Sequence, residues 1–283
     1  MILFKKADDL RNYLDTQCKK GRKQAFVPTM GALHMGHISL VETAKNNADE
    51  VISSIFVNPT QFNDPGDFKK YPVTIETDID MLEKAGCDVL FIPSVDEVYP
   101  EGISNQPVYD LGRLETLLEG KFRPGHFQGV CWVVQRLLEI VQPAQLYLGQ
   151  KDYQQCMVIR RLIELMNKKD QIELVICPTL REPSGLAMSS RNMRLDDTER
   201  KKAVTIYQCL AYIKDHIVKG ETGPLEIAAL SLLDGEGFRV DYVEIADAGN
   251  LEPIEEWDGK RKIVALIAAF LGDVRLIDNM VLN

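Results

Sequence analysis

The chain has 283 residues, enough for about two ordinary domains and for a sizeable core without disulfides or metals. It carries 33 basic and 42 acidic side chains, a formal net charge of −9 with histidine neutral. Because binding to a nucleic-acid backbone needs a basic surface, we expect no nucleic-acid partner. Hydrophobic residues make up 45% of the chain and charged residues 27%, the ordinary mixture of a globular protein.

The six cysteines are dispersed along the chain. The nearest two, Cys156 and Cys177, are 21 residues apart, so the chain has no Cys-x-x-Cys pair for redox or zinc chemistry. Scattered cysteines in a chain of this size indicate reduced thiols and a cytoplasmic location. The segment MILFKKADDL has no apolar stretch typical of a secretory signal. The longest strictly apolar run, Ile263 to Leu271, has nine residues, whereas a membrane span needs about 20. We therefore expect a buried strand there and no membrane association.

The first two-thirds of the chain alternates amphipathic stretches with short apolar runs. Helices are predicted at 7–21, over a stretch carrying Ile38 to Ala44, and at 77–86, 129–142 and 152–167. Strands are predicted at 25–28, 51–57, 88–93, 145–149 and 172–177. A nearly continuous, β-branched apolar run such as VISSIFV suits a strand covered on both faces of a parallel sheet. The repeated strand–helix units predict right-handed crossovers and an α/β fold with a Rossmann-like open parallel sheet.

The pattern changes after Cys177. The segment PTLREPSGLAMSSRN contains two prolines and a glycine, which indicates a loop and the expected domain boundary. A helix is predicted from about Asp197, then a second near 224–233, followed by strand-rich segments at 238–247, 262–270 and 274–282. Helices followed by closely spaced strands predict a smaller α+β domain with an antiparallel sheet. We expect the domains to cover residues 1–177 and 178–283.

The segment VPTMGALHMGHISL follows the strand predicted at 25–28. A proline and a glycine end this strand, which places the turn at the edge of the sheet where open α/β folds bind ligands. His34 and His37 lie three residues apart at the start of the next helix, so we expect both imidazoles on one face. Free N–H groups and the positive dipole end make that location favourable to phosphate. Gly36 leaves room for a flat ring to approach the backbone. The H-x-G-H spacing thus suits nucleotide binding.

Two other interpretations of the histidine pair are open. Histidines at this spacing can share a metal ion, but a structural zinc site needs four ligands, and only His126 and His216 remain as partners. The pair can also be incidental surface residues, since short motifs often occur by chance.

Three further polar clusters follow predicted strands, at what would be the same edge of the sheet. They are Asn58 and Gln61 in FVNPTQF, Lys151 and Gln155 in GQKDYQQ, and Ser189, Ser190 and Arg191 in GLAMSSRN. Each of these residue types is common in loops. Four polar clusters at successive strand ends, one of them H-x-G-H, together predict a ligand site.

Taken together, these segments resemble the pantoate–β-alanine ligase family. The resemblance runs over about residues 27–192, through VPTMGALHMGH, FVNPTQF, YPVT, FRPGHFQGV, GQKDYQQ and REPSGLAMSSRN. It implies a Rossmann-like domain with a smaller C-terminal lid, in a homodimer. It also implies a ligase of coenzyme A biosynthesis that joins pantoate to β-alanine with ATP, through pantoyl adenylate, releasing AMP and pyrophosphate.

The resemblance also assigns site residues. Those expected to contact ATP are Met30, Gly31, Ala32, Leu33, His34, Met35, Gly36, His37, Gly149, Gln150, Lys151, Asp152, Leu180, Met188, Ser189, Ser190 and Arg191. The catalytic residues would be His37 as proton donor, His34 as its partner and Lys151 on the phosphates. Gln61 and Gln155 would hold pantoate.

The resemblance further implies Mg²⁺ bound with the triphosphate, without identifying its protein ligands. Asp78 is the single candidate for an outer contact to this ion. The neighbouring Glu76 and a solvated helix face explain the same pattern as well.

Two rival functions fit the motifs less well. An adenylyltransferase acting on a phosphorylated substrate would call for a basic acceptor pocket rather than two glutamines. A non-catalytic nucleotide-binding regulator would have lost His34, His37, Lys151 or the Ser-Ser-Arg run, and all of these are present. The lysine-rich K-M-S-K-S loop of the related tRNA synthetases is also absent, since the aligned residues are Ala187 to Arg191 without a lysine.

Overall fold

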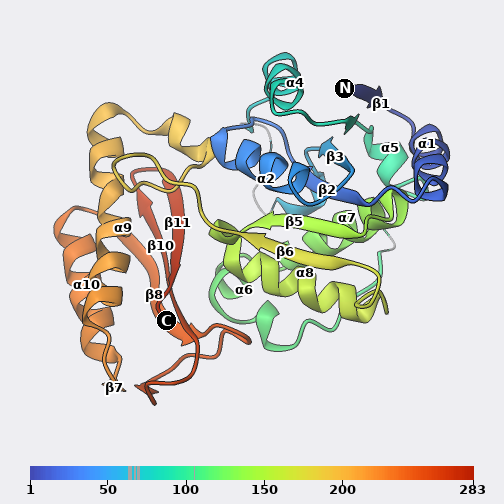
Figure 1. The fold of residues 1–283 in the computed structure, drawn as a ribbon. Helices are drawn as coiled ribbons and strands as arrows, with labels where there is room; N and C mark the ends of the chain where they lie inside the picture. The colour runs from blue at the N-terminus through green and yellow to red at the C-terminus, as the bar shows by residue number, and fades with distance from the viewer. Residues whose placement is uncertain (63–65, 67, 69–70, 105) are drawn as a thin grey trace.

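The computed structural model describes residues 1–62, 66, 68, 71–104 and 106–283. Two lobes lie side by side (Figure 1). The N-terminal lobe is built on a six-stranded sheet, and the C-terminal lobe on a three-stranded sheet with two long helices beside it.

The six-stranded sheet has the order β1-β4-β3-β2-β5-β6, and its neighbouring strands are parallel. Its strands are β1 (Ile2–Phe4), β2 (Gln24–Thr29), β3 (Glu50–Ile55), β4 (Val89–Phe91), β5 (Gln145–Gly149) and β6 (Glu173–Cys177). The predicted open parallel sheet is confirmed. Strand β1 was not predicted: it is three residues long, pairs with β4 at the edge of the sheet, and leaves Ile2 46% exposed.

Helices cover both faces of this sheet. They are α1 (Ala7–Lys19), α2 (Met35–Lys45), α4 (Ile75–Lys84), α5 (Val95–Val98), α6 (Leu118–Phe122), α7 (His126–Val141) and α8 (Tyr153–Leu165). Helices α1, α7 and α8 pack with Phe26 and Ile52, whereas α2 and α4 pack with Val27 and Val51. Successive residues of a strand point to opposite faces, so both faces of β2 and β3 are buried. The long helices were predicted with shifted ends, and the short α5 and α6 were not predicted.

The C-terminal lobe contains α9 (Asp197–His216) and α10 (Gly223–Gly235). Its antiparallel sheet has the order β11-β10-β8, with β8 at Arg239–Asp247, β10 at Ile263–Leu271 and β11 at Val274–Val281. A small pair, β7 (Gly220–Glu221) and β9 (Glu256–Trp257), lies apart from it. The predicted α+β arrangement and the buried strand at 263–271 are confirmed. Within the described part of the chain, no helix combines the length and the apolar character needed to cross a membrane.

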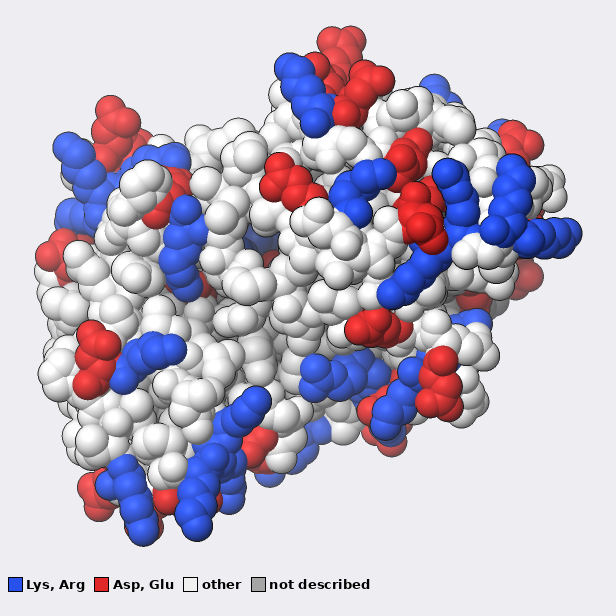
Figure 2. Space-filling view, viewed as in Figure 1, with Lys and Arg blue, Asp and Glu red and all other residues white. Residues whose placement is uncertain are grey.

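Polar contacts join the two lobes along β11. Arg275 of β11 donates two hydrogen bonds to the carboxylate of Glu119 in α6, each 2.8 Å long. Tyr242 of β8 donates to the same carboxylate at 2.8 Å. Figure 2 shows a hollow between the lobes and charges of both signs scattered over the face in view.

Candidate active site

A cavity of about 260 Å³ opens where β2, β5 and β6 end, between the parallel sheet and β11. Its lining includes most residues that the resemblance assigned, namely Met30, His34, Gly36, His37, Gln61, Gly149, Lys151, Asp152, Gln155, Leu180, Met188, Ser189, Ser190 and Arg191. Five assigned residues lie outside the lining: Gly31, Ala32, Leu33, Met35 and Gln150. Four segments far apart in the sequence therefore meet at one chamber, as the strand-end clusters predicted.

The two histidines cap helix α2 together. His34 is the N-cap residue, and its Nδ1 accepts a hydrogen bond from the Gly36 N–H at 3.1 Å. The N–H of His34 donates to Nδ1 of His37 at 3.3 Å. Since a backbone donor occupies each Nδ1, each neutral ring carries its proton on Nε2. The site thus offers two Nε2–H donors from rings whose centres are 4.1 Å apart.

Both imidazoles are neutral near pH 7. Burial, followed by the positive charge of Lys151, lowers the pKa of His34 to about 4. Burial lowers the pKa of His37 to about 3, with further contributions from His34 and Lys151. In the absence of ligand these rings are therefore hydrogen-bond donors rather than cations, and an anionic ligand would raise both pKa values.

Gly36 has no room for a side chain. A Cβ atom built on Gly36 would lie 2.8 Å from Cε1 and 2.9 Å from Nδ1 of His34. The His34 ring occupies the position that a side chain at residue 36 would take, while Gly36 itself lines the chamber. Glycine is needed here because the capping imidazole folds back over the first turn of the helix.

The structure also corrects the expectation for Asp78, which is 1% exposed rather than on a solvated helix face. Its carboxylate accepts hydrogen bonds from the N–H groups of Ala32 and Leu33, at 3.0 and 2.8 Å, and from the hydroxyl of Thr74 at 3.0 Å. Ala32 has a φ of 49°, a conformation that few residues other than glycine adopt. Asp78 therefore holds the strained turn that leads into His34, which is a different role from an outer contact to magnesium.

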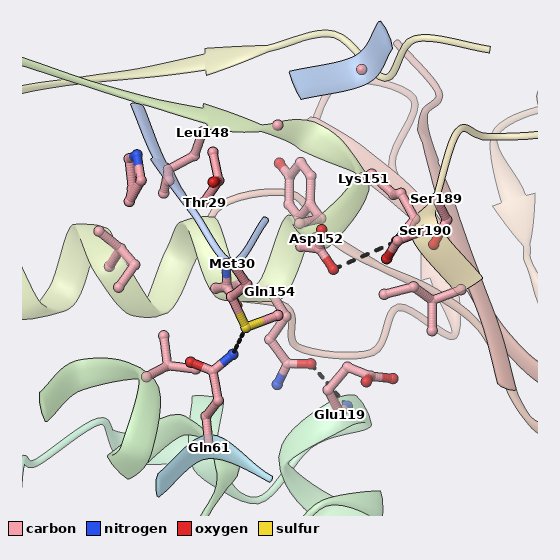
Figure 3. A pocket seen from close by; sticks show the side chains of 18 of the residues that line it. Thr29, Met30, Gln61, Glu119, Leu148, Lys151, Asp152, Gln154, Ser189 and Ser190 are labelled. Atoms are coloured by element: carbon pink, nitrogen blue, oxygen red, sulfur yellow. Dashed lines mark hydrogen bonds and ion pairs between the residues drawn. The ribbon is translucent and has the colours of Figure 1, made fainter. Parts of the chain in front are cut away.

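Gln61 is held at both its side chain and its backbone. Asn58 donates from Nδ2 to Oε1 of Gln61 at 3.2 Å, and Nε2 of Gln61 contacts the sulfur of Met30 at 2.8 Å (Figure 3). The Nδ1 atom of His126 is bonded to the carbonyl oxygen of Gln61 at 2.8 Å. The position of this amide is therefore set by contacts from two other segments of the chain.

Arg123 and His126 are the residues that the sequence reasoning missed. His126 was considered only as a metal ligand, but its Nε2 lies 3.0 Å from Nη1 of Arg123. Because arginine can only donate, Nδ1 of this ring carries the proton and donates to Gln61. Both residues belong to FRPGHFQGV, so this motif was the signal that could have found them.

The far side of the cavity is polar and carries positive charge. Nζ of Lys151, in a 3-10 turn at Gln150–Asp152, lies 3.7 Å from Oδ1 of Asp152. Ser189 caps a second 3-10 turn, Ser190–Arg194, by accepting from the Arg191 N–H at 3.3 Å. Figure 3 shows Lys151, Ser189 and Ser190 facing the chamber across from Gln61.

The metal interpretation of the histidine pair has no support from the geometry. Among the residues that the structure describes, no three His, Cys, Asp or Glu side chains form a group that could hold a metal ion. The nitrogen atoms of His126 are engaged by Arg123 and Gln61, and each Nδ1 of the capping pair accepts from backbone.

An open parallel sheet with paired imidazoles at a helix N-terminus, and a lysine lining the same chamber, defines a nucleotide-binding enzyme of the H-x-G-H class. Comparison with known proteins identifies the family within this class. The family model for pantoate-beta-alanine ligase matches residues 2–281. Over its whole length the chain is 45% identical to the pantothenate synthetase of Cytophaga hutchinsonii, covering 99% of that protein. It is 43% identical to the pantothenate synthetase of Thermosipho africanus, with both chains fully covered.

Solved structures agree with the sequence comparison. Pantothenate synthetase from Thermus thermophilus matches with a TM-score of 0.90 and 39% identity, over 99% of each chain. The pantoate-beta-alanine ligase from Francisella tularensis, solved with beta-gamma ATP and beta-alanine, matches with a TM-score of 0.80 and 38% identity, over 99% of this chain and 97% of that one. The chain belongs to the pantoate-beta-alanine ligase family, which confirms the resemblance found in the motifs.

Proposed function

We propose that this chain joins pantoate to β-alanine in two ATP-dependent steps. In the first, the pantoate carboxylate attacks the α-phosphate of ATP, forming pantoyl adenylate and releasing pyrophosphate. In the second, the amine of β-alanine attacks the adenylate carbonyl and releases AMP. The observation that carries the proposal is one chamber with a fixed amide, Gln61, on one side and the donors Lys151, Ser189 and Ser190 on the other.

Pantoate is proposed to bind on the amide side. Gln61 and Gln155 both line the chamber and are neutral, so they can accept from hydroxyl groups and donate to a carboxylate. Asn58 and His126 hold Gln61 before any ligand arrives, which reduces the ordering that binding requires.

The triphosphate is proposed to bind on the cationic side. Negative charge builds up on phosphate oxygens as pyrophosphate leaves, and donors already in position stabilise that charge. The Nε2–H groups of His34 and His37 and the ammonium of Lys151 are such donors. The negative ligand raises the pKa of His37, which suits this ring to its proposed role as proton donor. The backbone near Leu180 is proposed to contact adenine, with Met188 to Arg191 closing over the phosphates.

We propose that Mg²⁺ enters with the triphosphate. This ion is usually bound by one or two carboxylates together with phosphate oxygens and waters, so a cage made only of protein groups is not needed. The carboxylate of Asp152 lines the phosphate side of the chamber and fits such a contact, whereas Asp78 is engaged by backbone N–H groups.

We further propose a homodimer in the cytoplasm, with no nucleic-acid or membrane partner. All six cysteines are free, which fits a reducing compartment. The domain boundary is proposed just beyond Cys177, with the C-terminal lobe acting as a lid that shields the adenylate from water. Leu266 and Ile277 of that lobe line the chamber and would supply the apolar cover.

Product analysis tests the proposed reaction. The purified protein is incubated with ATP, pantoate and β-alanine, and phosphorus NMR follows the nucleotide while pantothenate is quantified separately. We expect AMP, pyrophosphate and pantothenate in equal amounts, and no pantothenate when β-alanine is omitted. Formation of ADP and inorganic phosphate would contradict an adenylate intermediate.

A further inference from the structure

The two segments proposed to bind phosphates are both held by one dipeptide of the C-terminal lobe. Asp278 and Asn279 lie in β11, outside every motif that the sequence singled out, and they are 5% and 2% exposed. Each side chain reaches a different segment of the site: Asn279 reaches the turn that carries Lys151, and Asp278 reaches the loop that leads to Ser189.

Asn279 uses its whole amide on the Lys151 turn. Its Nδ2 donates to the carbonyl oxygens of Gln150 and Lys151, at 2.9 and 2.8 Å, and its Oδ1 accepts from Nε2 of Gln150 at 3.3 Å. A side-chain amide can donate twice and accept at the same time, whereas an aspartate can only accept when ionised. The contact therefore needs an amide. It also fixes the distance between the Lys151 backbone and β11.

Asp278 holds the other segment through Arg181. Its Oδ1 accepts from Nη2 of Arg181 at 3.0 Å, and from the N–H of Asn279 at 2.8 Å. Arg181 forms an antiparallel bridge with Ala187, and the N–H of Met188 donates to the carbonyl of Leu180 at 3.0 Å. This hairpin continues directly into Ser189, so its anchor at Asp278 also sets where the phosphate loop begins.

The hairpin itself is tightly constrained. Gly185 has a φ of 95°, and a Cβ atom there would lie 2.2 Å from the ring of Tyr207. The guanidinium of Arg181 lies over the same ring, 4.8 Å from its centre. A rigid hairpin transmits the position of Asp278 to the loop that follows it.

We propose that Asp278 and Asn279 are positioning residues that set the spacing between Lys151 and the loop at 189–191. The proposal rests on the proposed function, since it needs both segments to contact the triphosphate. These contacts also fix this end of β11 to the Lys151 turn and to the hairpin at 181–187. Any closure of the C-terminal lobe would therefore be a rotation about this end of β11.

Single substitutions give the first test. Asn279→Ala is expected to raise KM for ATP about tenfold and to lower kcat, while KM for pantoate changes less than about twofold, because the amide side of the chamber is untouched. Asn250→Ala, in an exposed turn of the same lobe, is the matched control and is expected to leave all three constants unchanged. An equal rise in KM for both substrates after Asn279→Ala would overturn the proposal.

A double-mutant cycle with Lys151→Ala separates positioning from general support of the fold. If Asn279 acts through Lys151, Asn279→Ala lowers kcat/KM by about tenfold in the native background and by less than about twofold beside Lys151→Ala. Equal losses in both backgrounds would overturn the positioning role. A Lys151→Ala variant with native kinetics would instead overturn the role of Lys151 in the proposed function, so the two failures are distinguishable.

A second variant covers the case in which Asn279→Ala does not fold. In Asn279→Asp, an ionised carboxylate would face two carbonyl oxygens, and protonation restores one donor. The ratio of Asn279→Asp activity to native activity is therefore expected to rise as the pH is lowered. A ratio that is constant with pH would count against the proposed contact. Asp278→Asn is tested in a second double-mutant cycle, with Arg191→Ala. We expect Asp278→Asn to lower kcat/KM by less in the Arg191→Ala background than in the native background.

Discussion

The backbone N–H of His34 donates to Nδ1 of His37, and this contact decides which nitrogen of His37 carries the proton. The bond is 3.3 Å long, and it forms because His34 is the N-cap residue of α2 while His37 occupies the third position of the helix. Since Nδ1 accepts, the neutral ring carries its proton on Nε2. The spacing of H-x-G-H therefore suits the capping of α2.

This tautomer leads to a prediction for substitutions of His37. The amide nitrogen of glutamine reaches about as far as Nε2 of histidine, whereas that of asparagine stops near Nδ1. We expect His37→Ala and His37→Asn to lower kcat by at least about a hundredfold, and His37→Gln to lose about tenfold less than either. Steady-state rates at saturating substrates measure these losses, with far-UV circular dichroism as the check on folding. Equal losses in all three variants would show that the Nε2–H donor is not what His37 provides.

The buried carboxylate of Asp78 leads to a second prediction. In Asp78→Asn, one side-chain oxygen becomes an NH₂ group that faces a backbone N–H, so a buried donor loses its acceptor. We expect a loss of about 1–3 kcal/mol in the free energy of unfolding and a raised KM for ATP. Asp80→Asn, on the exposed part of the same helix, is the matched control. Urea unfolding and initial rates measure both quantities, and identical behaviour of the two variants would contradict the support role of Asp78.

The buried ring of His126 predicts a dependence of stability on pH. Burial, followed by the charge of Arg123, lowers the pKa of His126 from 6.5 to about 4. Between these values the unfolded chain binds a proton that the folded chain does not, so stability is complete above pH 6.5 and falls as the pH is lowered toward 4. The contribution to the slope is about 1.4 kcal/mol per pH unit within that window.

Replacing His126 with asparagine isolates this contribution. The amide nitrogen of asparagine can still donate to the carbonyl of Gln61, but the side chain no longer titrates. Urea unfolding across the window is expected to give a shallower pH slope for His126→Asn than for the native protein. Parallel slopes would mean that His126 is not held neutral in the folded state.

The contact between the lobes leads to a prediction about stability. Arg275 bonds the buried Glu119 and also Asp241, so Arg275→Met leaves two carboxylates without this cation. We expect a loss of up to about 3–5 kcal/mol in the free energy of unfolding, because the buried Glu119 carboxylate loses the cation that donates two hydrogen bonds to it, while Arg123 remains 3.8 Å away. Lys84→Met removes the exposed partner of Asp80 and is expected to lose less than about 1 kcal/mol. Similar losses in guanidinium unfolding would contradict the account of Glu119.

The parallel sheet was predictable because strands such as β3 are buried on both faces and have nearly continuous apolar, β-branched sequences. Sequence reasoning missed β1 because the apolar run there is only a few residues long and belongs to a half-exposed edge strand. For Asp78 the sequence left an outer contact to magnesium and a solvated helix face as alternatives, because helix periodicity cannot reveal that the turn at Ala32 covers this carboxylate.

The site was predictable where its residues follow strand ends, as Lys151 and Gln61 do. Asn279 and Arg275 were not predictable, because each acts through a contact more than a hundred positions away in the sequence. An isolated asparagine or arginine in a strand carries no sign of such a partner. The sequence motifs therefore predicted many of the groups that line the chamber, but not the contacts that hold them in place.

Isotope exchange between ATP and pyrophosphate tests the proposed adenylate most directly. The protein is mixed with ATP, labelled pyrophosphate and pantoate, and label appearing in ATP is measured with and without β-alanine. We expect exchange that requires pantoate, does not require β-alanine, and is lost in His37→Ala. Exchange that proceeds without pantoate, or that appears only when β-alanine is present, would contradict an enzyme-bound pantoyl adenylate.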